Sequence, residues 1–323
     1  METNSGHRIA QREVPGTRLT TSSIALAIDA TTLGSPAVDR RSVAVLRRAR
    51  SLGVTTFEVP GGRGARRAER LLAEALPAFD EAVVVLLRRS VRSLAEEGSE
   101  RPTGGSGDDL AARLRESLLR SAARLAPLTA GLVEWDPGGS PGAPTPGPAE
   151  LFEPLRGDGV VRGWVLAVTP DSPLASSDGV STPDVPRLFA GGLSPLDPRL
   201  IARYAERAAR VPTGFFARDP LGSGRLDGSR FAGSVVDRRP DQAPVNVRDL
   251  RREFAPVLRL AFLTQGRGRT LAQASLGFVL RWPWVCSALV PVPAPERLEE
   301  LLGAEVVAPV TAEEAERVLA LGP

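Results

Sequence analysis

Lysine is absent from this sequence of 323 residues, so all 41 residues of the lysine and arginine type are arginines. Without a lysine amine, the protein cannot form a Schiff base with a carbonyl substrate or with pyridoxal phosphate, and it has no phosphate-loop lysine. The guanidinium group of arginine stays protonated at neutral pH and cannot serve as a proton donor there. The missing residue type therefore excludes several classes of catalytic site.

Histidine, tyrosine and cysteine occur once each, as His7, Tyr204 and Cys286. A single cysteine excludes a disulfide framework, and one cysteine with one histidine gives too few ligands for a cysteine and histidine metal site. Cys286 lies in the apolar stretch RWPWVCSALV with no basic partner nearby, which predicts a small core residue and not a nucleophile. Tyr204 lies in the helical pattern LIARYAERAARV and is predicted to pack with its hydroxyl at the surface.

Long uninterrupted apolar runs are also missing. The most apolar segment, residues 271–293, is broken by Arg281 and by prolines, and the first residues lack the apolar core of a signal peptide. The sequence therefore predicts a cytoplasmic protein that does not interact with membranes.

Aromatic residues are scarce, at 5% of the chain, and the net charge is only +3. Arginines and acids are interspersed, as in RRAERLLAEAL, so no basic stripe with interleaved aromatic rings is expected. We therefore expect no nucleic-acid partner. The identity of a small-molecule ligand or a protein partner stays open.

The apolar residues, 42% of the chain, follow an alternating order of strand and helix patterns. Strand patterns cover residues 22–28, 54–59, 82–88, 130–136, 161–168, 187–193, 213–218 and 287–292. Helical patterns cover residues 37–51, 65–77, 108–125, 149–156, 198–209 and 270–281, and Gly53 is predicted to end the first of them. Near-continuous apolar strands that alternate with helices indicate a parallel sheet covered by helices.

About eight such units in a chain of this length favour a closed (β/α)8 barrel. No G-x-G-x-x-G pattern follows the first strand, which argues against a Rossmann domain. We predict a polar leader over residues 1–13 and a single barrel over residues 14–323. Segments rich in proline, glycine and serine, near residues 96–109, 136–149 and 169–186, are predicted to be flexible insertions.

The order of several motifs resembles the aldo-keto reductase family, whose members are NADPH-dependent (β/α)8 carbonyl reductases. The similar segments are VPGTRLTTSSIALAIDATTLG (14–34), VLRRARSLGVTTFEV (45–59), SLLRSAARL (117–125), LRGDGVVRGWVLAV (155–168), ARDPLGSGRLDG (217–228) and residues 271–304. The resemblance covers nearly the whole chain, and it implies a (β/α)8 TIM barrel with an N-terminal β-hairpin.

The catalytic residues of that family are an aspartate ending strand two, a tyrosine soon after it, a lysine ending strand three and a histidine ending strand four. In the family the tyrosine protonates the carbonyl oxygen that receives hydride, and the lysine, paired with the aspartate, lowers the tyrosine pKa. The matching positions here are Glu58, Arg63, Arg88 or its neighbour Arg89, and Trp135. None carries the family's residue, so the resemblance implies that standard carbonyl reduction is lost.

The cofactor positions implied by the resemblance are also altered. Ala167, Val168 and Ala190 stand where the family binds the nicotinamide amide with polar side chains. The glycine-rich loop with Leu221, Gly222, Ser223 and Gly224 is kept and could present backbone N–H groups to a pyrophosphate. Arg297 and Glu300 match the residues on the adenosine side, although Leu301 stands where the family usually has asparagine. We therefore expect either no cofactor or residual binding of NADP(H).

Two hypotheses remain for the altered site. Glu58 and Arg88 are expected at adjacent strand ends, either as a plain buried ion pair or as an anion-binding or acid–base pocket with Trp135 as its apolar wall. The favoured function is a non-reductase accessory or ligand-binding protein, compatible with bacterial specialised metabolism. The alternative is a repurposed enzyme, either an NADPH-dependent oxidoreductase with an altered site or a non-redox lyase or isomerase that uses Glu58 and Arg88.

Overall fold

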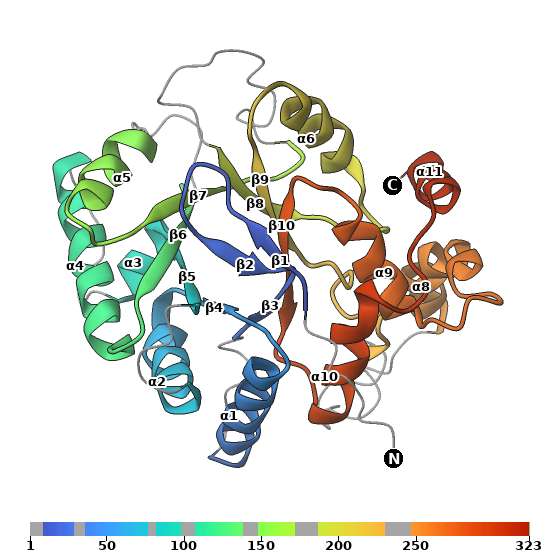
Figure 1. The fold of residues 1–323 in the computed structure, drawn as a ribbon, viewed down its shortest axis with the longest axis horizontal. Helices are drawn as coiled ribbons and strands as arrows, with labels where there is room; N and C mark the ends of the chain where they lie inside the picture. Colours follow the sequence, from blue (N-terminus) through green and yellow to red (C-terminus); the bar gives the residue numbers. More distant parts are fainter. Residues whose placement is uncertain are drawn as a thin grey trace.

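The structure is a computed structural model, and it describes residues 9–28, 36–76, 82–97, 107–137, 148–171, 187–229 and 247–322. Most of the three predicted insertions, and His7, lie outside these residues. The described residues form one closed barrel with a separate small hairpin (Figure 1).

Eight parallel strands close the barrel, with the last strand hydrogen-bonded to the first. They are β3 (Ile24–Ala27), β4 (Thr56–Val59), β5 (Val84–Ser90), β6 (Ala130–Asp136), β7 (Gly163–Ala167), β8 (Leu188–Gly192), β9 (Gly214–Arg218) and β10 (Val285–Pro291). Each strand lies within or close to a range predicted from its apolar pattern. The prediction of a (β/α)8 barrel is confirmed.

The helices form an outer ring around the strands (Figure 1). They are α1 (Pro36–Ser51), α2 (Ala65–Ala75), α3 (Val91–Glu97), α4 (Gly107–Leu125), α5 (Pro148–Gly157), α6 (Arg199–Arg210), α8 (Val247–Arg259), α9 (Leu271–Leu280), α10 (Pro295–Leu302) and α11 (Ala312–Ala320). Gly53 follows α1 with a φ of 99°, as expected for a glycine that ends a helix. The predicted helical ranges correspond to α1, α2, α4, α5, α6 and α9 and leave α3, α8, α10 and α11 without a counterpart.

The N-terminal hairpin lies across one end of the barrel (Figure 1). Its strands β1 (Gln11–Glu13) and β2 (Thr20–Ser22) are antiparallel, so residues assigned to the polar leader take part in it. Val14 and Leu19, from the hairpin turn, join the cluster of buried residues that fills the barrel interior. The hairpin thereby closes the base of the barrel, where the parallel strands begin.

Alternate residues of each strand face the barrel interior and the surrounding helices. The interior cluster includes Val84, Leu86, Leu132, Val165 and Phe216. Their strand neighbours belong to a second cluster that packs against the helices. This two-sided burial accounts for the near-continuous apolar character of the strands.

Cys286 is buried, as predicted, and burial raises the pKa of its thiol to about 12. The expectation for Tyr204 is wrong in one respect. Its hydroxyl is buried and has no hydrogen-bond partner among the described residues, because the rings of Phe189, Phe215 and Trp284 surround the residue. Burial raises the pKa of this phenol above its ordinary value.

No helix among the described residues is long and apolar enough to span a membrane. Within the same residues, no group of three or more histidine, cysteine, aspartate or glutamate side chains could hold a metal ion.

We predict that Gly214→Ala destabilises the protein by about 1–3 kcal/mol, because the barrel base is already filled. An added Cβ would lie 2.8 Å from Cys286 Sγ, 2.8 Å from Leu188 Cδ2 and 2.9 Å from Pro15 Cδ. The matched control is Gly192→Ala in β8, where an added Cβ meets nothing within 4 Å. Urea unfolding of both variants measures the difference, and equal stabilities would contradict a tightly closed base.

Candidate functional site

Four charged side chains meet at the end of the barrel where the strands terminate. Glu58 lies on β4, Arg88 on β5, Glu134 on β6 and Arg218 at the end of β9. We call these four residues the mouth cluster. Active sites of (β/α)8 proteins lie at this end of the barrel, so the cluster is the candidate functional site.

Arg218 joins strands that are not neighbours. Its Nε atom donates to both carboxylate oxygens of Glu134, at 2.9 and 3.1 Å, and its Nη2 atom also contacts Glu134. Its Nη1 atom donates to Glu58 Oε1 at 3.2 Å, and its Nη2 atom lies 2.9 Å from Glu58 Oε2. One guanidinium group on β9 therefore holds two carboxylates from β4 and β6, the strands that flank β5 across the barrel.

Arg88 makes a weaker contact at the rim of the mouth. Its Nη1 atom lies 3.7 Å from Glu58 Oε1, and half of its side chain is exposed. The expected proximity of Glu58 and Arg88 is therefore found, but Arg218 is the closer partner of Glu58. Two arginines and two glutamates give the mouth cluster a formal charge of zero if all four groups are ionised.

Burial governs the electrostatics of the mouth cluster. The side chains of Glu58 and Glu134 are 3% and 2% exposed. Burial raises the pKa of Glu134, and the negative charge of Glu58 adds to this effect while Arg218 opposes it. Burial also acts to lower the pKa of Arg218, but the charges of Glu58 and Glu134 outweigh it and raise that pKa above its ordinary value. Arg218 therefore remains a cation.

The structure separates Arg88 from Arg89, which the sequence left as alternatives. Arg88 points toward the mouth, whereas Arg89 is completely buried between the barrel and the helices. Arg89 Nε donates to Ser117 Oγ at 3.0 Å, and Arg89 Nη2 lies 3.5 Å from Glu69 Oε1. Burial lowers the pKa of Arg89, with Glu97 and Glu69 acting in the opposite direction. Arg89 thus belongs to a buried network under α2, α3 and α4.

The prediction that Trp135 forms an apolar wall of the mouth is wrong. Trp135 is buried on the helix side of β6, with its ring centroid 6.0 Å from that of Phe152 in α5. The preceding residue, Glu134, faces the mouth in its place, because strand neighbours point to opposite sides. An alternating reading of AGLVEWD could have identified Glu134, since Leu132 and Glu134 share one face.

Arg218 was also missed as a site residue. It is the last residue of β9, and a charged residue that ends a barrel strand is a recognisable signal for the functional end of this fold. The sequence could not show, however, that its guanidinium reaches Glu58 and Glu134.

Arg63 does not join the mouth cluster. It lies exposed on a short 3-10 turn (Gly62–Gly64) and lines a pocket of about 210 Å³ outside the barrel. Residues of α3 and α4, including Glu97 and Arg124, line the same pocket. The structure therefore brings Glu58 and Arg88 together and leaves Arg63 and Trp135 elsewhere.

The glycine-rich loop after β9 is already bound to one of its own carboxylates. The backbone N–H of Ser223 donates to Asp219 Oδ1, and the Ser223 hydroxyl donates to Asp219 Oδ2 at 2.8 Å. Leu221, Gly222 and Gly224 complete the same tight turn, in which Gly222 and Gly224 have positive φ angles. Because the carboxylate of Asp219 already accepts the N–H of Ser223 and adds a negative charge, a bound pyrophosphate is disfavoured in this loop.

Arg297 and Glu300, predicted for the adenosine side, bind each other. Arg297 Nε lies 2.6 Å from Glu300 Oε2, and Arg297 Nη1 donates to the backbone oxygen of Asp227 at 3.0 Å. At the positions expected for the nicotinamide side, Ala190 and Val168 are buried apolar residues and Ala167 is half-buried. Taken with Asp219 in the loop and Arg218 across the mouth, these residues do not fit NADP(H).

Comparison with known proteins supports the fold. No protein-family model matches the sequence, and a search against curated proteins finds no relative. Among solved structures, an aldo-keto reductase of Bacillus halodurans in its holo form is similar over 98% of this chain and 97% of its own, with a TM-score of 0.70 and 18% identity.

Two further solved structures are similar. A thermostable aldo-keto reductase crystallised with the inhibitor epalrestat covers 97% of this chain and 100% of its own, with a TM-score of 0.68 and 17% identity. A glycerol dehydrogenase of Gluconobacter oxydans covers 96% of this chain and 94% of its own, with a TM-score of 0.69 and 17% identity. The chain therefore has the fold of the aldo-keto reductases.

Proposed function

We propose that this protein is a non-reductase with the aldo-keto reductase fold, which acts in the cytoplasm as a ligand-binding or accessory protein. The observation that carries this proposal is the position of Arg218 at the barrel mouth, where it is bound to both Glu58 and Glu134. Its guanidinium group joins β9 to β4 and β6, so the carboxylates on those two strands are already paired.

The chemistry of the mouth supports the same proposal. Carbonyl reduction requires a proton donor beside the carbonyl oxygen and a hydride donor in line with it. The phenol of Tyr204 is buried in α6 against Phe189 and Phe215, away from the mouth cluster. The arginines cannot donate a proton at neutral pH. Reduction by the mechanism of the resembling family therefore lacks its proton donor among these groups.

We predict that the purified full-length protein shows no saturable binding of NADPH at micromolar concentration. The reason is that the residues of the glycine-rich loop, of the mouth cluster and of the expected adenosine side are each already paired within their own group. Isothermal calorimetry measures this directly. With a panel of aldehydes, NADPH oxidation should stay at the rate without enzyme.

The control for this prediction is Arg297→Ala. Saturable NADPH binding by the natural sequence that weakens in Arg297→Ala would show a working cofactor site and overturn the proposal. Binding that is unchanged in Arg297→Ala would mean that NADPH binds at another surface. In that case, only aldehyde-dependent oxidation of NADPH would be evidence of reductase activity.

We predict that Arg218→Met lowers the free energy of unfolding by about 3–5 kcal/mol at neutral pH, because it leaves two buried carboxylates without their shared partner. Burial already raises the pKa of Glu134, and loss of Arg218 would raise it further. A carboxyl whose pKa is higher in the folded than in the unfolded state lowers the stability of the protein above the unfolded-state pKa. The protein regains this stability as the pH falls toward that value. The loss should therefore shrink between neutral pH and about pH 5.

Urea unfolding at both pH values measures this effect. The matched control is Arg210→Met, which removes an exposed pair with Glu206 and should change stability little. A small, pH-independent loss in Arg218→Met would contradict the role of Arg218 as the shared partner of the two buried carboxylates.

One observation favours a second candidate function. The raised pKa of Glu134 is typical of a carboxyl that acts as a general acid, which would suit a repurposed lyase or isomerase that uses Glu58, Glu134 and Arg88. The close pairing of both glutamates with Arg218 disfavours this role, because neither carboxylate is free to meet a substrate.

The protonation state of Glu134 tests the second candidate. Infrared difference spectra between the natural sequence and Glu134→Gln, recorded at neutral pH, show whether a protonated carboxyl band disappears in the variant. We expect no such band at neutral pH, since Arg218 holds Glu134 as a carboxylate. A band that titrates near neutral pH would promote the acid–base enzyme.

A further inference from the structure

A second pocket lies at the opposite end of the barrel from the mouth cluster. Its volume is about 280 Å³, and it is bounded by the hairpin turn, by α5 and by the first residues of β7 and β8. Pro15, Leu188 and Trp164 supply apolar surface, and Arg156, Arg162 and Arg187 supply positive charge. None of these residues takes part in the mouth cluster.

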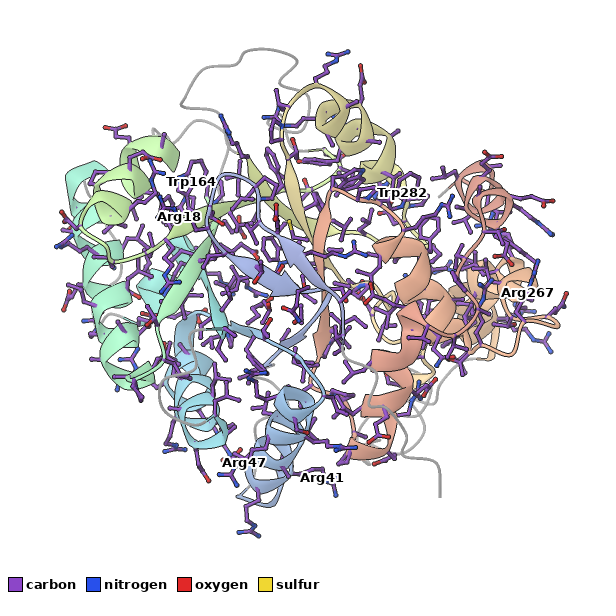
Figure 2. All side chains as sticks on the ribbon, viewed as in Figure 1. Arg18, Arg41, Arg47, Trp164, Arg267 and Trp282 are labelled. Atoms are coloured by element: carbon purple, nitrogen blue, oxygen red, sulfur yellow. The ribbon has the colours of Figure 1, made fainter. Side chains whose placement is uncertain are left out.

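Trp164 gives the pocket a fixed aromatic surface. Its ring stacks on that of Phe152 in α5, with centroids 5.7 Å apart and planes inclined by 19°, and the residue is half-buried. In Figure 2, Trp164 lies between α5 and the hairpin. Since Phe152 supports the ring from within the protein and Trp164 lines the pocket, the indole is placed to stack on a planar ligand.

The charges around Trp164 are unbalanced. Glu153 is the one acid in the lining, and Arg156 binds it, with Nε at 3.0 Å from Glu153 Oε2. Neither guanidinium of Arg162 or Arg187 has an ion pair or hydrogen bond within the part of the chain that the structure describes. Three arginines and one glutamate leave a net charge of +2 in the lining.

The backbone fixes both unpaired arginines at the pocket. Arg162 immediately precedes β7, and its backbone N–H donates to the backbone oxygen of Gly131 at 3.0 Å. Arg187 stands just before β8, and its Cδ lies 3.4 Å from the position that a Cβ on Gly16 would take. Its side chain therefore passes over the hairpin turn, where Gly16 has a φ of 75°.

We propose that this base pocket binds a small aromatic carboxylate. The ring would stack on Trp164, and the carboxylate would receive hydrogen bonds from Arg162 and Arg187, whose planar forks suit carboxylates. The volume lies near the lower end of the range for ligand pockets, about 300–1,000 Å³, which fits a ligand of one or two rings. The proposal does not depend on what the barrel mouth binds.

Calorimetric titration of the full-length protein with naphthalene-2-carboxylate tests the proposal. Two matched probes separate the contributions: naphthalene-2-carboxamide has the ring without the charge, and cyclohexanecarboxylate has the charge without the aromatic ring. We expect saturable binding of the aromatic carboxylate and binding at least about tenfold weaker for each of the other two. Equal affinities for all three probes, or no saturable binding of the first, would overturn the proposal.

Substitutions locate the site. Arg187→Gln and Arg162→Gln should each weaken binding of naphthalene-2-carboxylate by about tenfold or more, because each removes a charged hydrogen bond. Both side chains are exposed, so the folded protein should persist, and circular dichroism confirms this. The matched control is Arg41→Gln, an exposed arginine on α1 that Figure 2 shows pointing away from the barrel.

Trp164→Leu tests the stacking contact, and it should abolish the preference for the aromatic over the saturated carboxylate. If that variant does not fold, the arginine variants still decide the outcome. Unchanged affinity in both Arg187→Gln and Arg162→Gln would place the carboxylate elsewhere and refute the proposed site.

Discussion

The guanidinium group of Arg218 is the interaction on which the functional end of this barrel depends. It lies at the end of β9 and reaches Glu58 on β4 and Glu134 on β6, so one side chain ties together strands that are not adjacent in the sheet. Two buried carboxylates without this cation would be costly, because the barrel interior beneath them is apolar. Charge pairing across the barrel therefore holds the ends of these strands together.

The two ends of the barrel are built by different physical means. At the base, the hairpin turn inserts Val14 and Leu19 into the interior cluster, so apolar packing seals that end. At the mouth, hydrogen-bonded charges take over where the apolar layers stop. Arg162, Arg187 and the indole of Trp164 lie outside this apolar seal and line the base pocket.

The sequence predicted the elements better than the side-chain directions. Strand positions followed from the apolar runs, because a strand that is buried on both faces has a nearly continuous run of apolar residues, which the local sequence shows. A single-residue error then exchanged Trp135 for Glu134, since adjacent strand residues face opposite sides of the sheet. The same alternation separates Arg88 at the mouth from Arg89 in the helix layer. The helices α8 and α11 were missed, although the T-x-x-E pattern of Thr311 and Glu314 is a capping box that marks the start of α11.

The sequence by itself determined the inventory of chemical groups and the order of strands and helices. It excluded lysine chemistry and a disulfide framework, because these depend only on which residues are present, and its periodicity indicated the barrel. Only the tertiary structure decided which charges meet. Arg218 lies 84 residues after Glu134 and 160 residues after Glu58 in the sequence, and closure of the barrel brings the three together. Packing of α6 against the outside of the barrel buried the hydroxyl of Tyr204, and the hairpin turn lies beside the side chain of Arg187. Contacts of this kind depend on strand register and the direction of each side chain, which no local pattern in the chain specifies.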